Sequence, residues 1–170
     1  MSPVPRPAPR SVALAHVIEA VTGRPASVAA DLVVTGATLD SRAVLPGDLY
    51  AALPGHNTHG SRFAAEAVAA GAAAVLTDAD GAALIGSSEV PVVVVEEPRS
   101  LLGAMAAEIY YHPARSMQMI GVTGTNGKTT VTAMVAAGLG AAGVAVGTIG
   151  TIGVRIGDEM LPGARTTRVR

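Results

Sequence analysis

The amino-acid sequence predicts an α/β fold, in which strands and helices alternate along most of the chain. Short apolar runs such as residues 90–97 (VPVVVVEE) alternate with segments such as residues 11–23, in which apolar residues recur at helical spacing. In addition, a glycine-rich segment, residues 121–130 (GVTGTNGKTT), stands where a strand would turn into a helix. The chain of 170 residues is long enough for one domain and part of a second.

The first part of the chain is expected to begin with a helix that Ser11 caps and Gly23 ends. The apolar side chains of this helix that should face the core are Leu14, Val17, Ile18 and Val21. The elements expected after it are strands at 31–40 and 48–53, a capped helix at 60–71, strands at 73–77 and 90–97, and a helix at 100–111. Strands that alternate with helices in this way are typical of an α/β domain.

Residues 112–115 (HPAR) break the last of these helices and are expected to link it to a second unit. The second unit should contain a strand at 117–120, the glycine-rich loop, a helix from Thr129 to about Leu139 and a strand at 144–146. We therefore expect a disordered proline-rich tail at 1–10, a domain at 11–113 and an incomplete α/β domain at 114–170. A nucleotide-binding sheet needs more strands than this, so we expect the chain to be incomplete.

The glycine-rich loop contains the only lysine of the chain, Lys128. Backbone amides of such a loop and of the helix that follows form an anion site, and a lysine adds a compact positive charge for a phosphate. Thr129 would offer its hydroxyl to a magnesium ion. The general phosphate-loop pattern requires glycine where this chain has Val122, so the loop must be a variant of that pattern. The alternative is a glycine-rich hairpin turn.

Composition argues against several kinds of partner. The net charge is -1, and the aromatic residues are Phe63 and three tyrosines, so neither nucleic acid nor an anionic membrane is favoured. The absence of cysteine excludes disulfides and is compatible with a reducing cytosol. The uncharged stretch at 129–154 could span a bilayer by length, but its many glycines argue against insertion.

Other polar residues have simpler interpretations when they are taken alone. Residues 40–42 (DSR) are typical of a turn whose side chains bind the local backbone. His56 and His59 could suggest a metal pair, but their surroundings favour a polar loop. The acidic residues that we interpret as solvated ends of strands and loops are Asp78, Asp80, Glu96 and Glu97.

Residues 123–130 (TGTNGKTT) resemble the phosphate loop of the Mur ligases, the ATP-dependent amide ligases that build the peptide stem of bacterial peptidoglycan. This motif alone would also fit folylpolyglutamate synthetases. Residues 38–78, however, resemble the uridine-nucleotide-binding domain of the third and fourth ligases of the pathway. Residues 124–130 and 146–151 (VGTIGT) are most similar to the ligases that add the third amino acid. The resemblance extends from about residue 11 to Thr167.

The resemblance implies that an N-terminal uridine-nucleotide-binding α/β domain is followed by the start of a phosphate-loop ATP-binding α/β domain. It implies ligation of meso-diaminopimelate or L-lysine to UDP-MurNAc-L-Ala-D-Glu, with ATP and Mg²⁺ as cofactors, by a cytoplasmic monomer. The implied substrate contacts are Leu39, Ser41, His56, Asn57, Thr58, Thr166 and Thr167, with Arg165 where the family usually has asparagine. The implied ATP loop is Gly124, Thr125, Asn126, Gly127, Lys128, Thr129 and Thr130, in which Lys128 contacts the β- and γ-phosphates and Thr129 binds Mg²⁺.

The resemblance also places several functional parts beyond Arg170: the acidic metal ligand, a carbamoylated lysine and the C-terminal domain that recognises the incoming amino acid. We therefore expect the 170-residue chain to be inactive alone. One alternative is a nucleotide-binding module without catalysis. A phosphate-loop kinase or a transporter-type ATPase is a further alternative, but it would leave residues 38–78 without a role.

Overall fold

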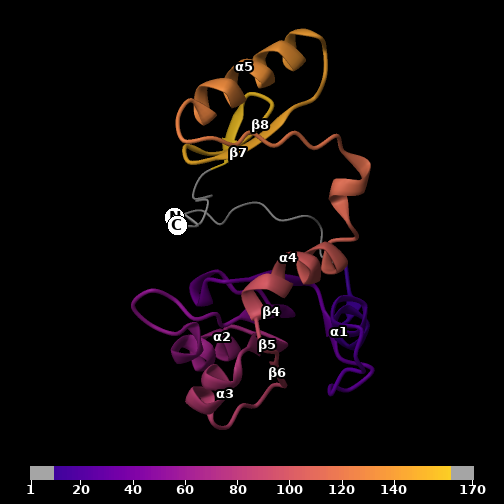
Figure 1. Cartoon of the computed structure of the whole chain (residues 1–170). Coiled ribbons are helices and arrows are strands. Elements are labelled where there is room, and N and C mark those ends of the chain that lie inside the picture. The colour runs from indigo at the N-terminus through magenta and orange to yellow at the C-terminus, as the bar shows by residue number, and fades with distance from the viewer. Residues whose placement is uncertain (1–9, 162–170) are drawn as a thin grey trace. The chain divides into compact units, whose positions relative to one another are not determined.

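The structure is a computed structural model that describes residues 10–161. The chain divides after Met117 into two compact units. We refer to residues 10–117 as the first unit and to residues 118–161 as the second unit (Figure 1). Residues 1–9, which include most of the predicted tail, lie outside the described residues, as do Arg165, Thr166 and Thr167.

The first unit is built on a sheet of four parallel strands. In spatial order these strands are β3 (Gly36–Thr38), β4 (Asp48–Ala51), β5 (Ala74–Thr77) and β6 (Val92–Val94). A separate antiparallel pair is formed by β1 (Val12–Ala13) and β2 (Val33–Val34). Because the four strands are parallel, the loops that follow them all leave from the same edge of the sheet. This is the edge where open α/β sheets usually bind their ligands.

Helices cover both faces of the sheet. The α-helices are α1 (Leu14–Thr22), α2 (Ala64–Ala69), α3 (Ala79–Ile85) and α4 (Pro98–Ile109). The 3-10 helices are η1 (Ser41–Ala43), η2 (Gly60–Phe63) and η3 (Pro113–Ser116). One buried cluster joins α1 and α4 to the sheet, while α2 and α3 pack with the opposite face. Figure 1 shows α1 on one side of the strands, and α2 and α3 on the other. This layered arrangement confirms the predicted α/β fold of the first unit.

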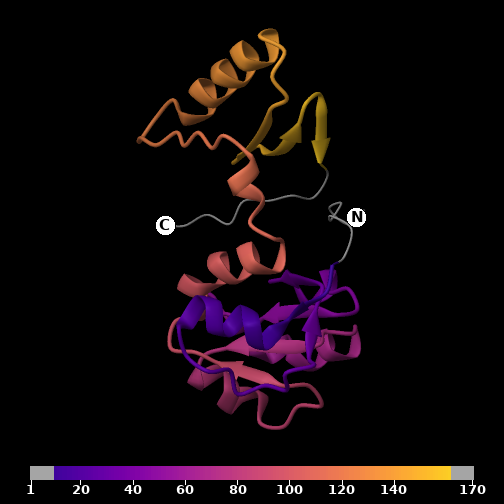
Figure 2. The ribbon, with the colours of Figure 1, turned by 90° about the vertical axis from the view of Figure 1, so that its right-hand side faces the viewer.

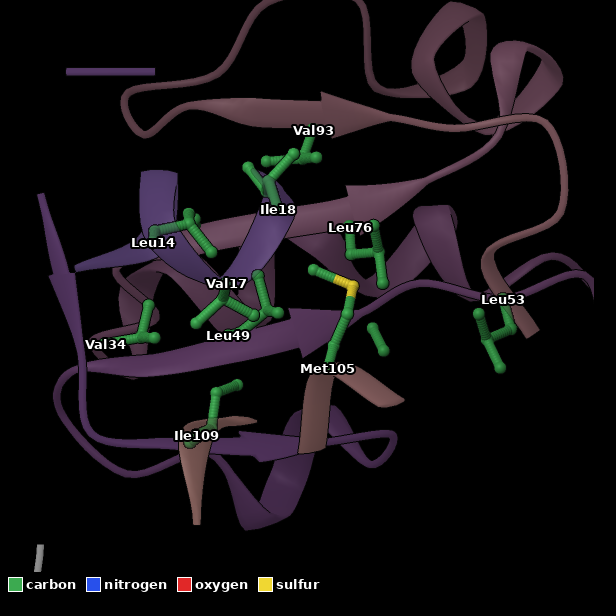
Figure 3. Packing of buried hydrophobic residues seen from close by; sticks show 12 residues of the cluster. Leu14, Val17, Ile18, Val34, Leu49, Leu53, Leu76, Val93, Met105 and Ile109 are labelled. Carbon is green, nitrogen blue, oxygen red and sulfur yellow. The ribbon is translucent and has the colours of Figure 1, made fainter. Parts of the chain in front are cut away.

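The two faces follow from the alternation of side chains along the buried strands. In β4, Leu49 and Ala51 belong to the cluster under α1 and α4, whereas Tyr50 belongs to the cluster under α2. Figure 3 shows the first of these clusters from close by, with Met105 of α4 beside Leu49 and Leu76. Since β4 and β5 are covered on both faces, they carry continuous apolar runs, as is typical of parallel strands.

Three expectations for the first unit are wrong in detail. Ser11 does not cap α1: the backbone stays extended to Ala13 because β1 pairs with β2, and the amide of Leu14 donates to the carbonyl of Leu32 at 2.8 Å. The single strand expected at 31–40 is divided into β2 and β3, which belong to different sheets. The helix α3 was not expected, and it begins directly after β5.

The second unit consists of one helix and a three-stranded antiparallel sheet (Figure 2). Its elements are α5 (Lys128–Ala141), β7 (Gly147–Gly150), β8 (Gly153–Ile156) and β9 (Glu159–Leu161). The helix confirms the one expected from Thr129 to about Leu139. Among residues 10–161, no helix has both the length and the apolar composition that crossing a membrane requires.

Two strands of the second unit are not where we expected them. Residues 117–120 form no ladder with any described strand, and Met117, Met119 and Ile120 are exposed. A strand is defined by its hydrogen-bonded neighbours, so apolar sequence alone does not make one. Val144 instead closes the end of α5, where its amide donates to the carbonyl of Leu139 at 3.0 Å. Gly143, with φ of 80°, makes this ending possible, and the strand begins only at Gly147.

Candidate functional site

The glycine-rich loop of the second unit leads directly into α5, as expected for a phosphate loop. Gly127 is the residue before the helix, and no side chain caps α5 there. Gly124 and Gly127 have φ of 141° and 77°, values that residues with a side chain rarely adopt. Since the loop continues into a helix and does not return as a strand, the hairpin-turn alternative is wrong.

The start of α5 has the properties of an anion site. The first amides of a helix have no acceptor within the helix, and the helix dipole places partial positive charge at this end. A Cβ added at Gly127 would meet nothing within 4 Å, so the space beside the loop is open. Each residue of the predicted ATP loop, from Gly124 to Thr130, is exposed. The exposed hydroxyl of Thr129 is thus available at the first turn of the helix.

Lys128 bends back over the loop that precedes it. Its Nζ donates to the carbonyl oxygen of Gly124 at 2.6 Å and lies 3.4 Å from that of Thr125. The only lysine of the sequence is therefore exposed, with its ammonium group hydrogen-bonded to the loop carbonyls. Thr132 donates its hydroxyl to the carbonyl of Lys128 at 2.8 Å, which bonds the first turn of α5 to the second.

A cavity of about 800 Å³ lies within the second unit, between α5 and the strands β7 and β8. Its wall exposes more apolar than polar surface, although Lys128, Thr129 and Arg155 contribute to it. A mostly apolar wall offers few donors to a phosphate. The groups with the chemistry to bind an anion are therefore those of the loop and the first turn of α5.

The predicted uridine-nucleotide contacts follow β3 and β4 at the carboxyl edge of the first unit's sheet. Leu39 comes directly after β3 and is 48% exposed. Ser41 begins η1 and is buried, and its Oγ donates to Oε2 of Glu66 at 2.9 Å. Because the two strands are neighbours, the structure brings these residues to the same edge as residues 56–58.

Asp40 and Arg42 form the predicted turn, in which a side chain binds the local backbone. One oxygen of the Asp40 carboxylate accepts from the Arg42 amide at 3.1 Å and from its Nε at 2.9 Å, while the other accepts from Nη2 at 2.9 Å. The hydrogen bond from the Arg42 side chain is the main cause that lowers the pKa of Asp40, and partial burial opposes it. Asp40 and Arg42 thus satisfy each other, which leaves Ser41 as the residue of this turn that reaches α2.

The expected substrate loop is a tight hairpin between β4 and η2. Pro54 and His59 form an antiparallel bridge, and the amide of Gly55 donates to the carbonyl of Thr58 at 3.1 Å. We refer to residues 54–59 as the edge hairpin. Its tip carries the three predicted contacts His56, Asn57 and Thr58, all of them exposed. The hairpin therefore presents these polar side chains to solvent at the carboxyl edge of the sheet.

Two contacts at the base of the edge hairpin were not anticipated. Nη2 of Arg99, in the first turn of α4, donates to the carbonyl of Pro54 at 2.8 Å. Nε2 of His59 lies 3.1 Å from Oδ1 of Asp78, so Asp78 is not the solvated loop end that we expected. Asp78 is also the N-cap of α3, where it accepts from the amide of Gly81 at 2.7 Å. An aspartate directly after an apolar strand is a recognisable N-cap signal, which could have predicted both α3 and this role.

His56 and His59 do not act together as a pair: His56 is exposed at the tip of the edge hairpin, whereas His59 binds protein groups at its base. Both ring nitrogens of His59 have protein partners, since Nδ1 accepts from the amide of Ser61 at 3.1 Å. Within residues 10–161, no group of three or more His, Cys, Asp or Glu side chains is arranged to hold a metal ion.

Comparison with protein families gives two matches that follow each other along the chain. Residues 33–110 match the Mur ligase family, catalytic domain, and residues 122–168 match the Mur ligase middle domain. The first match covers the parallel sheet with the edge hairpin, and the second covers most of the phosphate loop and α5.

Several curated proteins are similar to the chain. The UDP-N-acetylmuramoyl-L-alanyl-D-glutamate--2,6-diaminopimelate ligase of Streptomyces avermitilis is 48% identical over 137 residues, which are 81% of this chain and 27% of that protein. The ligase of the same name from Pseudomonas aeruginosa is 46% identical over 109 residues, 64% of this chain and 22% of that protein. The UDP-N-acetylmuramyl-tripeptide synthetase of Leifsonia xyli is 45% identical over 79% of this chain and 26% of its own length.

A solved structure of a UDP-N-acetylmuramoyl-L-alanyl-D-glutamate--2,6-diaminopimelate ligase has the same fold, with a TM-score of 0.68 at 23% identity. The match covers 92% of this chain and 31% of that one. The chain thus spans about a quarter of the length of the curated relatives it matches. Two consecutive family matches, which enclose the sheet edge and the phosphate loop described above, establish that the chain belongs to the Mur ligase family.

Proposed function

We propose that the chain forms the substrate-binding and phosphate-loop parts of an ATP-dependent ligase that joins 2,6-diaminopimelate to UDP-MurNAc-L-Ala-D-Glu. The observation that carries this proposal is the order of the two family matches, each of which encloses a site of suitable chemistry. We choose diaminopimelate over L-lysine because the relatives from Streptomyces avermitilis and Pseudomonas aeruginosa are named for that amino acid.

The second unit would hold the phosphates of ATP. Free amides at the first turn of α5, the open loop at Gly124 and Gly127, and the charge of Lys128 are together suited to a polyphosphate. Lys128 would have to exchange its bonds to the carbonyls of Gly124 and Thr125 for phosphate oxygens. In the absence of nucleotide, these same bonds keep the ammonium group beside the loop.

Magnesium fits the same place, because the Thr129 hydroxyl is exposed at the first turn of α5 and hydroxyl oxygen is a suitable ligand for a hard cation. When bound, ATP with Mg²⁺ would supply the phosphoryl group that activates the substrate carboxylate for attack by an amine. The loop amides and Lys128 would orient the phosphates and neutralise their charge. These residues thereby account for positioning and charge stabilisation.

The first unit would hold the uridine nucleotide at the carboxyl edge of its sheet. Leu39 offers an exposed apolar surface, while the tip of the edge hairpin, His56 to Thr58, offers hydrogen-bonding groups. A pyrimidine, a ribose and a diphosphate together need both kinds of contact. Ser41 would contribute through its Oγ, whose position is fixed by Glu66.

The same proposal places the protein in the cytoplasm, since its cosubstrate would be ATP and its chain lacks cysteine. We propose that it acts as a monomer, because all the proposed nucleotide contacts come from this one chain. For the 170-residue polypeptide itself we propose nucleotide binding without ligation, because it corresponds to about a quarter of the length of its relatives.

The experiment that tests the proposal is a graft of residues 11–161 into the matching segment of the Streptomyces avermitilis ligase. We expect the grafted protein to ligate diaminopimelate, and we expect the same graft with Lys128→Ala to be inactive. The Lys128→Ala graft is the matched control because it differs at one exposed side chain. A graft that folds and binds both nucleotides but does not ligate would contradict the proposal.

A further inference from the structure

His59 and Asp78 connect the loops that follow two neighbouring strands. His59 is the last residue of the edge hairpin, after β4, and Asp78 comes directly after β5. Nε2 of His59 and Oδ1 of Asp78 are 3.1 Å apart, and only 13% and 20% of the two side chains are exposed. The pair therefore ties the exposed hairpin to a buried part of the sheet edge.

The hydrogen bonds of His59 determine which of its nitrogens carries the proton. Nδ1 accepts from the backbone amide of Ser61 at 3.1 Å, so Nδ1 has no hydrogen. In a neutral imidazole the hydrogen then lies on Nε2, which donates to the carboxylate of Asp78. Oδ1 of Asp78 also accepts from the amide of Gly81 at 2.7 Å. Each bond thus fixes the orientation of the next group.

The surroundings of the pair are closely packed and polar. Ser61 and Thr77 are buried, and their hydroxyl oxygens are 3.0 Å apart. Thr77 also donates to the carbonyl of Ala52 at 2.9 Å. A side chain at Gly81 would collide with Thr77, with Ser61 and with the ring of His59. Such packing leaves the imidazole little freedom to turn.

We infer that His59 and Asp78 are positioning residues for the nucleotide: they touch no ligand, but they hold the edge hairpin in the conformation in which His56, Asn57 and Thr58 can bind one. This inference rests on the proposed function for the identity of the ligand, a uridine nucleotide. The position of the hairpin itself rests only on the contacts described above, so the two parts can be tested separately.

Two substitutions separate the link to Asp78 from the capping bond. His59→Asn keeps an acceptor for the Ser61 amide, since asparagine is a favoured N-cap, but its side chain is too short to reach Asp78. Asp78→Asn keeps an oxygen that accepts from both Gly81 and His59, so it is the matched control. Both variants are compared in the 170-residue chain.

The first measurement is amide hydrogen exchange without ligand. Gly55 reports on the hairpin through its bond to Thr58, and Gly23, which is bonded to Glu19 at the end of α1, reports on the rest of the unit. We expect exchange at Gly55 to be about tenfold faster in His59→Asn, because the hydrogen bond to residue 78 has been lost, while Asp78→Asn, which keeps that hydrogen bond, changes it by less than about twofold. Gly23 should be unchanged in both variants.

The second measurement is a calorimetric titration with UDP. We expect binding to be about tenfold weaker in His59→Asn and within about twofold of the wild type in Asp78→Asn. Unchanged exchange at Gly55, or equal UDP affinity of His59→Asn and wild type, would overturn the inference. If exchange changes as expected but the wild type does not bind UDP, the hairpin is held as we infer and the proposed ligand is wrong.

Discussion

Replacing Gly81 by alanine should destabilise the first unit, although alanine is the better helix former. Gly81 lies in the first turn of α3, where an added methyl group would overlap Thr77, Ser61 and the His59 ring. Overpacking of this kind costs about 1–3 kcal/mol, whereas the helix propensity of alanine returns at most about 1 kcal/mol. We therefore expect Gly81→Ala to lower the free energy of unfolding by about 1–2 kcal/mol.

Gly103→Ala is the matched control, because Gly103 lies within α4 and an added methyl group would meet nothing within 4 Å. This variant should be more stable than the wild type by about 0.5–1 kcal/mol. The assay is urea unfolding followed by tyrosine fluorescence. It reports on the first unit alone, because the three tyrosines, Tyr50, Tyr110 and Tyr111, all lie there. If Gly81→Ala were stabilised as much as Gly103→Ala, the close packing at His59 would be refuted.

Three other perturbations have defined outcomes. Lys128→Ala should weaken ATP binding by at least about tenfold in calorimetry, because the point charge for the phosphates is lost; unchanged affinity would contradict the assignment. Arg42→Ala should raise the pKa of Asp40 in an NMR titration, since the folded pKa is lowered mainly by the Arg42 side chain. In the wild type, the ion pair of Asp40 and Arg42 stabilises the fold above the ordinary pKa of aspartate, and this stability is lost as pH falls through the lowered pKa of Asp40. If Arg42→Ala left the titration of Asp40 unchanged, this reasoning would be wrong. The pKa of Tyr50 is raised mainly by burial and to a smaller extent by the charges of Asp40 and Glu66. The stability that the neutral, buried Tyr50 contributes to the fold should therefore be lost as pH rises past the ordinary pKa of tyrosine. Tyr50→Phe should remove that part of the alkaline loss of stability; unfolding curves at increasing pH test this.

The sequence was sufficient for those features that depend on local patterns. The helical spacing of Leu14, Val17 and Ile18 predicted α1, and these side chains are buried. The passage of the glycine-rich loop into α5 was predicted from glycines that few other residues can replace and from a lysine at the start of a helix. In both cases, the residues that define the feature are neighbours in the sequence.

Features that depend on distant contacts could not be predicted in this way. Ser11 has the chemistry of an N-cap, but the pairing of β1 with β2 moves the start of the helix. Residues 117–120 have the composition of a strand but no described ladder partner. The contact between His59 and Asp78 depends on β4 and β5 being neighbours in the sheet. None of these three outcomes is determined by residues that are close in the sequence.

The measurement that tests the division of function most directly is a calorimetric titration of the 170-residue chain with UDP-MurNAc-L-Ala-D-Glu. Wild type, Ser41→Ala and Lys128→Ala should be compared after circular dichroism has shown that each is folded. We expect saturable binding to wild type, binding about tenfold weaker in Ser41→Ala, and binding within about twofold of wild type in Lys128→Ala, because Ser41 and Lys128 lie in different units. Failure of the folded wild type to bind, or equal loss of affinity in the two variants, would contradict this division.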